Sequence, residues 1–476
     1  METSQTTENL NETTDSTVPK SSTLEEISQE KISGVAMQDL KKSEGVGEML
    51  ENFKVKELQE NSENTNSNTK EEESQHVNRV CYKWDIPLKQ LREAVEEYQP
   101  TKSCENFTKG CQWSPDGTCL LVSSEDFNNR IYELPHEFYS EKIPLNVEST
   151  NMTAILNIKE GGIIYDTCWY PYMNSWEPAT CCFLSTSRQS PIHLWDAFNG
   201  ELRATYRAYN QVDEVEASIS VQFIDSAKEL WAGYKNALRF FDMERPGRQI
   251  NTIYFKKEFP NVIGLVSCIR ENPIMPGLVA FGTYSKCIGL YKNGPLCSFQ
   301  TGSGVTQIEF SPCGTKLFSA VRRSNEFLCW DLRNPGTVLH SFQGRQANTN
   351  QRIHFNITPD AKQLISGGTD GNIVIWELSE SINDANPNLT HQIKLSSDCI
   401  NGVSLHNTLP ILATSTGQRL CDSNKREREI SGRVTSRLPV WYKAVVQSVA
   451  ACSPVETVGF QRFSSRRALT QGGLSG

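Results

Sequence analysis

The sequence lacks the features that mark membrane, secreted and metal-binding proteins. No run of 18 apolar residues occurs, so no segment is predicted to span a membrane. The chain begins METSQTTENLNETT, without a basic stretch followed by an apolar one, which predicts an intracellular protein rather than a secreted one. None of its 15 cysteines forms a Cys-x-x-Cys pair. We therefore expect most cysteines to be reduced core residues, and no metal site.

Motifs for catalysis and cofactor binding are also missing. The chain has no Gly-x-Ser-x-Gly elbow, no glycine-rich phosphate loop and no His-Glu-x-x-His pattern. Four of its seven histidines, His193, His340, His354 and His406, fall in strand-like stretches, where a core or turn role is expected. The sequence predicts a protein that is not an enzyme and has no cofactor and no small-molecule substrate.

Aromatic residues are nearly absent from residues 1–76, where Phe53 is the only one. This segment carries 17 Asp/Glu and 7 Lys/Arg. Such a composition cannot bury enough apolar surface to offset the entropy of ordering, which predicts a disordered acidic arm, either a solvating extension or a regulatory tail. The arm contributes −10 to a net charge of −9, so the remaining residues sum to about +1. The acidic total is therefore compatible with a nucleic-acid partner.

What the sequence does contain is a repeated β pattern. Between Gln351 and Leu378, three short strand patterns are separated by Pro359-Asp360-Ala361 and by Asp370-Gly371, and the third ends at Trp376. Asp-Gly accepts the positive φ of a tight hairpin turn. The stretch is typical of one blade of a β-propeller.

The unit recurs along the chain. Its third strand closes, in most copies, with an aromatic residue followed by Asp or Glu, at spacings close to the roughly 40 to 45 residues of a WD repeat, with an insertion in the second unit. The closing triplets are Ile131-Tyr132-Glu133, Leu194-Trp195-Asp196, Phe240-Phe241-Asp242, Leu290-Tyr291-Lys292, Cys329-Trp330-Asp331 and Ile375-Trp376-Glu377. The sequence predicts an all-β, WD-repeat β-propeller of seven blades, with eight as the other possible count.

The ends of the predicted propeller are its least regular parts. We divide the chain into the arm (1–76), a lead-in segment (77–105), the propeller (106–419) and a basic, irregular tail (420–476). A short helix is expected at 87–95, and part of the lead-in segment is a candidate to pair with the last blade. The seventh unit lacks its third strand unless Leu438 to Trp441 supplies it, and Pro439 would restrict that strand to an edge.

Cationic and tyrosine residues gather in two sets of predicted loops. Turns between the second and third strands share one face in WD repeats, and most carry a cation, Asp126 and Asp370 being the exceptions. Loops that lead into the blades are expected on the same face. Arginine suits RNA because guanidinium pairs with phosphate and stacks on bases, as tyrosine rings also do. The alternative is that these are solvated turn residues or residues packed between blades. The candidate RNA-binding residues are Arg188, Lys235, Lys286, Arg322, Arg323, Arg345, Arg352, Tyr206, Arg207, Tyr209 and Arg419.

Several interior motifs resemble the telomerase Cajal body protein family, over about residues 104–419. They are GCQWSPDGTCLL at Gly110, IYDTCWY at Ile164, SPIHLWDAFNGELRATYRAYN at Ser190, FLCWDLR at Phe327, TNQRIHFNITPD at Thr349 and CINGVSLHNTLPILATSTGQR at Cys399. After Arg419 the sequence departs from the family pattern, which continues with an acidic, Gly-rich insertion and a final Trp-containing strand.

The resemblance implies a non-catalytic RNA-binding protein. Its expected partners are small Cajal-body RNAs of the H/ACA class, recognised at a short box in the terminal loop, telomerase RNA, and the protein components of H/ACA and telomerase particles. It implies location in the nucleus and Cajal body, with the cytoplasm and telomeres as further sites, and a role in telomerase trafficking and telomere maintenance. The alternative is a WD-repeat adaptor that binds proteins without reading RNA.

Overall fold

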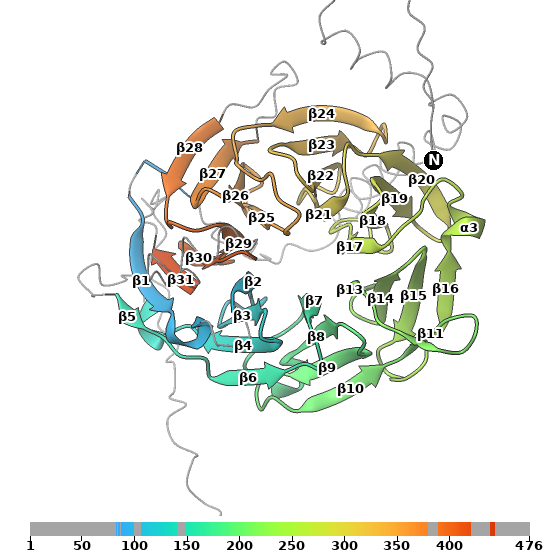
Figure 1. The fold of residues 1–476 in the computed structure, drawn as a ribbon, viewed down its shortest axis with the longest axis horizontal. Coiled ribbons are helices and arrows are strands. Elements are labelled where there is room, and N and C mark those ends of the chain that lie inside the picture. The colour runs from blue at the N-terminus through green and yellow to red at the C-terminus, as the bar shows by residue number, and fades with distance from the viewer. Residues whose placement is uncertain are drawn as a thin grey trace, which may run out of the picture.

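The structure is a computed structural model that describes residues 82, 84–85, 87–99, 106–139, 149–378, 389–419 and 438–442. Seven blades are arranged in a ring (Figure 1), and cavities along the axis of this ring form a central channel. This confirms the WD-repeat β-propeller and the count of seven that the sequence predicted. The acidic arm, and the tail apart from 438–442, lie outside the described residues.

Six blades are sheets of four strands that follow one another outward in chain order, and the seventh is a five-stranded sheet with the order β29-β30-β31-β1-β5. We number the blades from the one that begins with β2. The innermost strands are β2 (Thr108–Trp113), β7 (Ile164–Trp169), β13 (Ser220–Ile224), β17 (Val266–Glu271), β21 (Val305–Phe310), β25 (Phe355–Ile357) and β29 (Ile400–Leu405). The second strands are β3 (Cys119–Ser124), β8 (Cys182–Ser187), β14 (Glu229–Tyr234), β18 (Val279–Thr283), β22 (Lys316–Val321), β26 (Gln363–Gly367) and β30 (Ile411–Thr416).

The third strands carry the closing triplets of the sequence repeat. They are β4 (Asn128–Glu133), β9 (Ile192–Asp196), β15 (Ala237–Asp242), β19 (Cys287–Tyr291), β23 (Phe327–Asp331), β27 (Asn372–Glu377) and β31 (Leu438–Tyr442). The outer strands are β6 (Leu156–Lys159), β10 (Leu202–Tyr206), β16 (Asn251–Tyr254), β20 (Pro295–Gln300), β24 (Thr337–Phe342), β28 (Leu389–Lys394) and β1 (Lys89–Ala94). The remaining short elements are β5 (Thr150–Asn151), β11 (Ala208–Tyr209), β12 (Val215–Glu216), α3 (Phe255–Glu258) and the 3-10 turns η2 (Glu96–Tyr98), η3 (His136–Tyr139) and η4 (Pro178–Thr180).

The core lies between neighbouring blades rather than within one. Leu278 and Ile288 of the fourth blade, for example, belong to one buried cluster with Ile308, Leu317 and Trp330 of the fifth. Sheets bury both faces in this arrangement, which accounts for the β-branched, apolar second and third strands. The sixth blade, whose sequence pattern was the most regular, has Trp376 fully buried, and Gly371 adopts φ +78 in its Asp-Gly turn.

The ring is closed by strands from both ends of the chain. In the seventh blade β31 lies between β30 and β1, so the blue and red ends of the propeller are side by side in Figure 1. Two expectations are corrected here. The segment at 87–95 contains strand β1 and not a helix. Strand β31 is an interior strand, not an edge, because it pairs with β30 on one side and with β1 on the other. Pro439 is tolerated because the pairing with β30 spans only Val440 to Tyr442.

Candidate functional site

The cationic turns lie at one end of the blades. Each turn between a second and a third strand is at the end of the blade opposite to the loop between the first and second strands, because the strands are antiparallel. We call this the turn face. Its predicted cations are placed there as expected: Arg188, Lys235, Lys286, Arg323 and Arg419 are exposed, and Arg322 is half-buried. The two acidic exceptions also lie on these turns, and Asp126 is paired with Arg130 at 2.5 Å.

A cavity of about 700 Å³ opens into the channel at this face. Four cations and two carboxylates line it, so its wall carries an excess of positive charge with His354 neutral; they are Lys109, Arg322, Arg352, Arg419, Glu125 and Asp166. The Arg322 guanidinium lies over the Tyr284 ring, 3.6 Å from its centroid. Such a stacked arginine still presents edge N–H groups, which can pair with phosphate or with a base edge.

Two cations converge on one carboxylate at the wall of this cavity. The Lys109 ammonium lies 2.9 Å from Glu125 Oε2 and donates to the Ile164 carbonyl at 3.1 Å, and Arg419 also contacts Glu125. Burial lowers the pKa of Lys109, and Glu125 partly offsets that shift. One carboxylate thus serves two cations, which leaves this side of the mouth positively charged.

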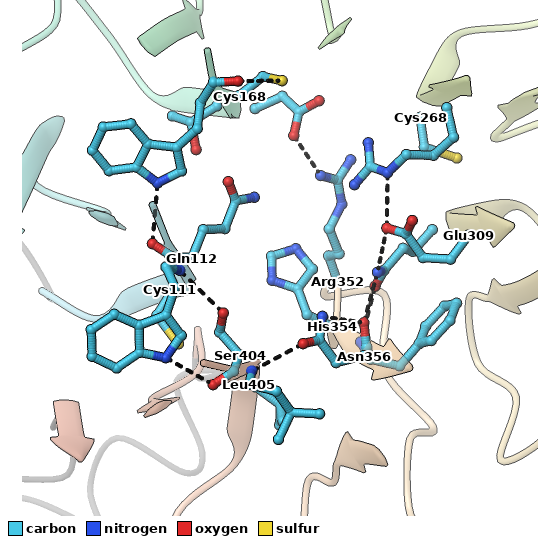
Figure 2. Close-up of a pocket in the computed structure, with 18 of the residues that line it drawn as sticks. Cys111, Gln112, Cys168, Cys268, Glu309, Arg352, His354, Asn356, Ser404 and Leu405 are labelled. Carbon is cyan, nitrogen blue, oxygen red and sulfur yellow. Dashed lines mark hydrogen bonds and ion pairs between the residues drawn. The ribbon is translucent and has the colours of Figure 1, made fainter. Parts of the chain in front are cut away.

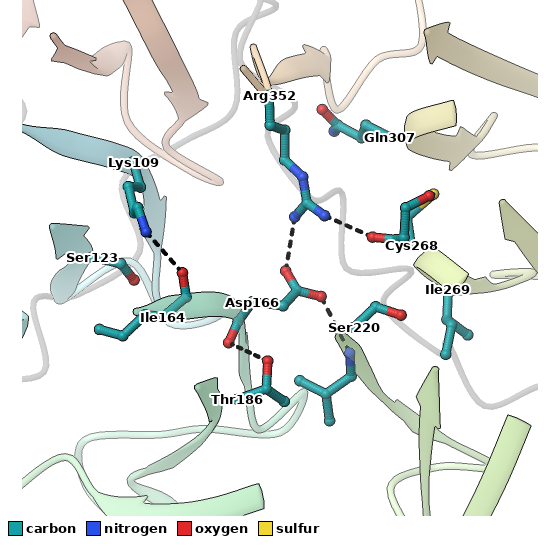
Figure 3. A network of polar contacts seen from close by, with 12 residues as sticks. Lys109, Ser123, Ile164, Asp166, Thr186, Ser220, Cys268, Ile269, Gln307 and Arg352 are labelled. Atoms are coloured by element: carbon teal, nitrogen blue, oxygen red, sulfur yellow. Dashed lines mark hydrogen bonds and ion pairs between the residues drawn. The ribbon is translucent and has the colours of Figure 1, made fainter. Parts of the chain in front are cut away.

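Arg352 crosses the channel below the cavity (Figure 3). Its guanidinium donates to Asp166 Oδ1 at 3.0 Å and to the Ser267 carbonyl at 2.6 Å, and the other Asp166 oxygen accepts the Val221 N–H at 3.2 Å. The contacts join the inner parts of the second, third, fourth and sixth blades. Arg352 was predicted to bind RNA, but two of its guanidinium N–H groups donate to Asp166 and Ser267 within the channel.

A second cavity of about 370 Å³ lies on the other side of Arg352 (Figure 2). Its wall includes the ion pair of Arg270 with Glu309 at 2.8 Å. His354 faces both cavities, and burial together with Arg352 and Arg270 lowers its pKa to about 3. The channel is therefore divided by Arg352 and Asp166, and a ligand at the turn face meets the larger cavity first.

Two predicted RNA contacts are buried between blades. Arg345 is 2% exposed, stacks 3.8 Å from the Phe327 ring centroid, and donates to Ser366 Oγ and the Ser324 carbonyl, both at 3.3 Å. Burial lowers the pKa of Arg345 to about 9. Tyr206 is fully buried and donates its hydroxyl to the Met243 carbonyl. Arg345 and Tyr206 are thus packed between blades, which is the alternative that the sequence left open for the residues of these loops.

Arg207 and Tyr209 lie at the rim instead of the channel mouth. The Arg207 N–H donates to the Gly247 carbonyl at 2.7 Å, in the loop between the third and outer strands of the next blade. Arg248 covers the Tyr209 ring at 4.5 Å. Figure 1 shows the neighbouring β11 at the outer edge beside β15 and β16. These two residues are not brought together with the cations of the mouth.

Sequence reasoning missed Lys109 and Tyr284. Lys109 is on the inner strand β2, and Tyr284 follows strand β18. The alternation of residues along an inner strand predicts which side chains share a side of that strand. It does not predict which residues of different blades meet at the channel mouth, because that depends on how the ring closes. Within the described ranges, no group of three or more His, Cys, Asp or Glu could hold a metal ion. The same residues include no helix long and apolar enough to cross a bilayer.

Comparison with known proteins gives a family-model match and several similar proteins. Residues 336–377 match the family model for the WD domain, G-beta repeat. The chain is 44% identical over 325 residues to Telomerase Cajal body protein 1 of Mus musculus, 66% of this chain and 60% of the relative. It is 43% identical over 322 residues to the Homo sapiens protein of that name, 66% and 58%. The Drosophila melanogaster homolog is 38% identical over 351 residues, 70% and 62%. The chain thus spans about 60% of these relatives' length, and the motif resemblance is confirmed.

Proposed function

We propose that this chain, which is similar over its β-propeller to proteins named telomerase Cajal body protein 1, is an RNA-binding scaffold without catalytic activity. It binds H/ACA RNAs of Cajal bodies and telomerase RNA, and it recognises a short sequence box in the terminal loop of these RNAs. By holding these RNAs and their protein components it supports their location in the nuclear Cajal body, telomerase trafficking through the cytoplasm and to telomeres, and telomere maintenance.

The observation that carries the proposal is the cationic mouth of the turn face. Its cavity has four cations against two carboxylates and a tyrosine stacked under Arg322. Around it, Arg188, Lys235 and Lys286 are exposed and have no ion pair or side-chain hydrogen bond with the described residues. Phosphates of a loop would pair with these outer cations, while an unstacked base would enter the cavity and meet Tyr284 and Arg322.

The burial and position of the side chains change the set of residues that we propose for this role. Arg345 and Tyr206 leave the proposed interface because they are buried, and Arg207 and Tyr209 leave it because they lie at the rim. Arg352 remains at the floor of the cavity, where its contacts connect neighbouring blades. The proposed contacts are Lys109, Arg188, Lys235, Tyr284, Lys286, Arg322, Arg323 and Arg419.

The first test compares an H/ACA hairpin with and without its loop box, using the full chain. Specific reading predicts at least tenfold weaker binding when the box is replaced, since each lost base contact costs about 1 to 3 kcal/mol. Equal affinity for both hairpins would exclude box reading.

The second test concerns the face. Arg322→Ala combined with Arg323→Ala should reduce the slope of log affinity against log salt by about 0.7 for each lost phosphate contact of a single strand. Arg245→Ala is the matched control, because Arg245 is 87% exposed in the loop between β15 and β16, at the other end of its blade. An equal change of slope in the Arg322→Ala, Arg323→Ala variant and in the Arg245→Ala variant would show that the turn face is not the RNA-binding face.

The alternative function is a protein adaptor that uses the same cations to bind acidic peptides. It is favoured only by the fact that guanidinium groups pair with carboxylates as well as with phosphates. Nuclease treatment of purified complexes separates the two, because an adaptor keeps its partners after the RNA has been removed.

A further inference from the structure

The second blade exposes three large aromatic side chains at the end opposite to the turn face. Tyr172 and Trp176 belong to the loop between β7 and β8, and Phe198 to the turn between β9 and β10. They are 56%, 65% and 70% exposed. We call these three residues the aromatic surface. The Tyr172 ring also lies 6.0 Å from the Tyr170 ring. Large aromatic side chains exposed to water at the same end of one blade cost solvation free energy, and such exposure is typical of a binding surface.

Hydrogen bonds hold the two loops together, so the exposed side chains belong to ordered loops. The Arg203 guanidinium donates to the Pro178 and Ala179 carbonyls at 2.7 and 2.5 Å and to Asp196 Oδ2 at 2.8 Å. Asn174 Oδ1 accepts the Trp176 N–H at 3.0 Å, and Asp196 Oδ1 accepts the Phe198 N–H at 2.7 Å. The aromatic surface is therefore pre-organised, which lowers the entropic cost of binding.

The surroundings of the aromatic surface are acidic. Glu177 and Glu201 are exposed in the same two loops, and the nearby Arg203 of β10 is already bound to Asp196 and two carbonyls. Glu133 of the first blade lies at the same end. The N–H of its neighbour Leu134 donates to the Thr118 carbonyl, and the Thr118 hydroxyl lies 2.7 Å from the hydroxyl of Ser175, which belongs to the loop between β7 and β8. A partner must therefore offer positive charge together with a group that packs on aromatic rings.

We propose that the aromatic surface binds an arginine-containing, extended segment of another protein. Guanidinium is the one protein cation that stacks flat on Trp, Phe and Tyr while pairing with carboxylates at its edge. The position matters as well. Arg188 lies on the turn between β8 and β9, whereas the aromatic surface is at the other end of the same blade. One propeller could therefore hold an RNA on the turn face and a protein on the aromatic surface at the same time.

The insertion in the second sequence repeat supplies part of this surface. The repeat is long because of the residues before β7 and the long loop between β7 and β8, which carries η4 and Trp176. The packing of the core does not require Trp176 or Phe198, since both are more than half exposed. Their replacement is thus compatible with folding, which allows a direct test.

The test measures binding of labelled synthetic peptides to the full chain by fluorescence anisotropy. The probe alternates Arg with Leu; matched peptides carry Lys, or Glu, in place of Arg. We expect the Arg peptide to bind most tightly and the Glu peptide not to bind. Trp176→Ala with Phe198→Ala should weaken the Arg peptide by at least about tenfold, as loss of central aromatic contacts does. Ile263→Ala, at a side chain 63% exposed, is the control and should change nothing.

Three results would overturn the proposal. The first is equal binding of the Arg and Glu peptides, or no loss in the double variant. The second is a loss of hairpin affinity in the double variant, which would place both ligands on one face. The third is self-association, measured by sedimentation, that the double variant abolishes, because the surface would then be an interface between copies of this chain. Unchanged hairpin affinity in the double variant supports the separate site and does not depend on which RNA is read.

Discussion

At the scale of single residues, the sequence located the cations but not their roles. Arg323 and Arg345 both lie in loops within three residues of the end of a strand, and both were predicted to bind RNA. In the structure Arg323 is exposed and donates to Asn350 Oδ1, whereas Arg345 is buried against Phe327. The difference arises from the neighbouring blade, which covers one guanidinium and not the other.

This contrast gives a paired prediction. Arg345→Ala removes a buried stacking partner and leaves Ser366 without its donor, so we expect it to lower the free energy of unfolding by about 2 kcal/mol or more. Arg323→Ala should leave unfolding within about 0.5 kcal/mol and should weaken RNA binding. Urea denaturation and hairpin titration of both variants measure this. If the folded Arg345→Ala protein lost RNA affinity as strongly as Arg323→Ala, the assigned roles would be wrong.

A buried histidine sets a second residue-scale prediction. His406 is 1% exposed, donates Nε2–H to the Gly117 carbonyl at 2.9 Å, and accepts the Thr408 and Leu409 N–H groups at Nδ1. Burial lowers the pKa of His406 to about 4. The unfolded state therefore takes up a proton first as pH falls, so stability is complete above about pH 6.5 and declines toward pH 4.

We expect His406 to contribute a loss of about 2 kcal/mol of unfolding free energy between pH 7.5 and pH 5, in the same direction as His354. Urea denaturation at several pH values in this range measures it, above the range in which most carboxylates titrate. His406→Gln should make the pH dependence shallower, whatever its stability at pH 7.5. An unchanged slope would show that this imidazole is protonated in the folded state.

At the scale of elements, the closing blade shows why the sequence pattern misled. Leu91 and Ala94 are three residues apart and both buried, a spacing that suits a helix. They lie in strand β1, where a register shift between Gln90 and Arg92 interrupts the alternation of the two faces. A β-bulge of this kind places residues three apart on one face. Proline at 87 then added a misleading helix-start signal.

The role of β31 can be tested at Leu438. This side chain is fully buried in a cluster with Leu91, Ala94 and Ile411. We expect Leu438→Ala to lower the unfolding free energy by about 2 to 5 kcal/mol, as other buried leucine truncations do. Leu202→Ala, at a side chain 48% exposed, is the matched control and should cost little. Equal effects of the two would mean that β31 does not complete the seventh blade.

At the scale of the whole molecule, charge is divided between the arm and the rest of the chain. Residues 1–76 carry −10 and the remainder about +1, and the cations of that remainder include the ring of turns around the channel mouth. Negative charge carried on the same chain as a cationic face lowers the local concentration of RNA, and salt screens this effect.

Removal of residues 1–76 should therefore strengthen binding of non-specific RNA by up to about tenfold at low salt, with the gain vanishing as salt rises. The measurement is anisotropy over a salt series. An arm of the same composition in scrambled order is the control and should behave like the natural arm, because charge and not order is the cause. A scrambled arm that behaves like the deletion would refute this explanation.

The sequence by itself determined the repeat: the turns, the buried strands and the closing aromatic residues are local patterns, and they gave the seven blades and the face that carries the cations. Tertiary structure alone decided how the ring closes, which arginines are solvent-exposed, where the cavities form and that Trp176 and Phe198 are more than half exposed. The physical reason is range. Strand and turn preferences act between neighbours in the chain, whereas β1 with β31, Arg352 with Asp166 and Lys109 with Glu125 and Arg419 meet only when distant blades are assembled.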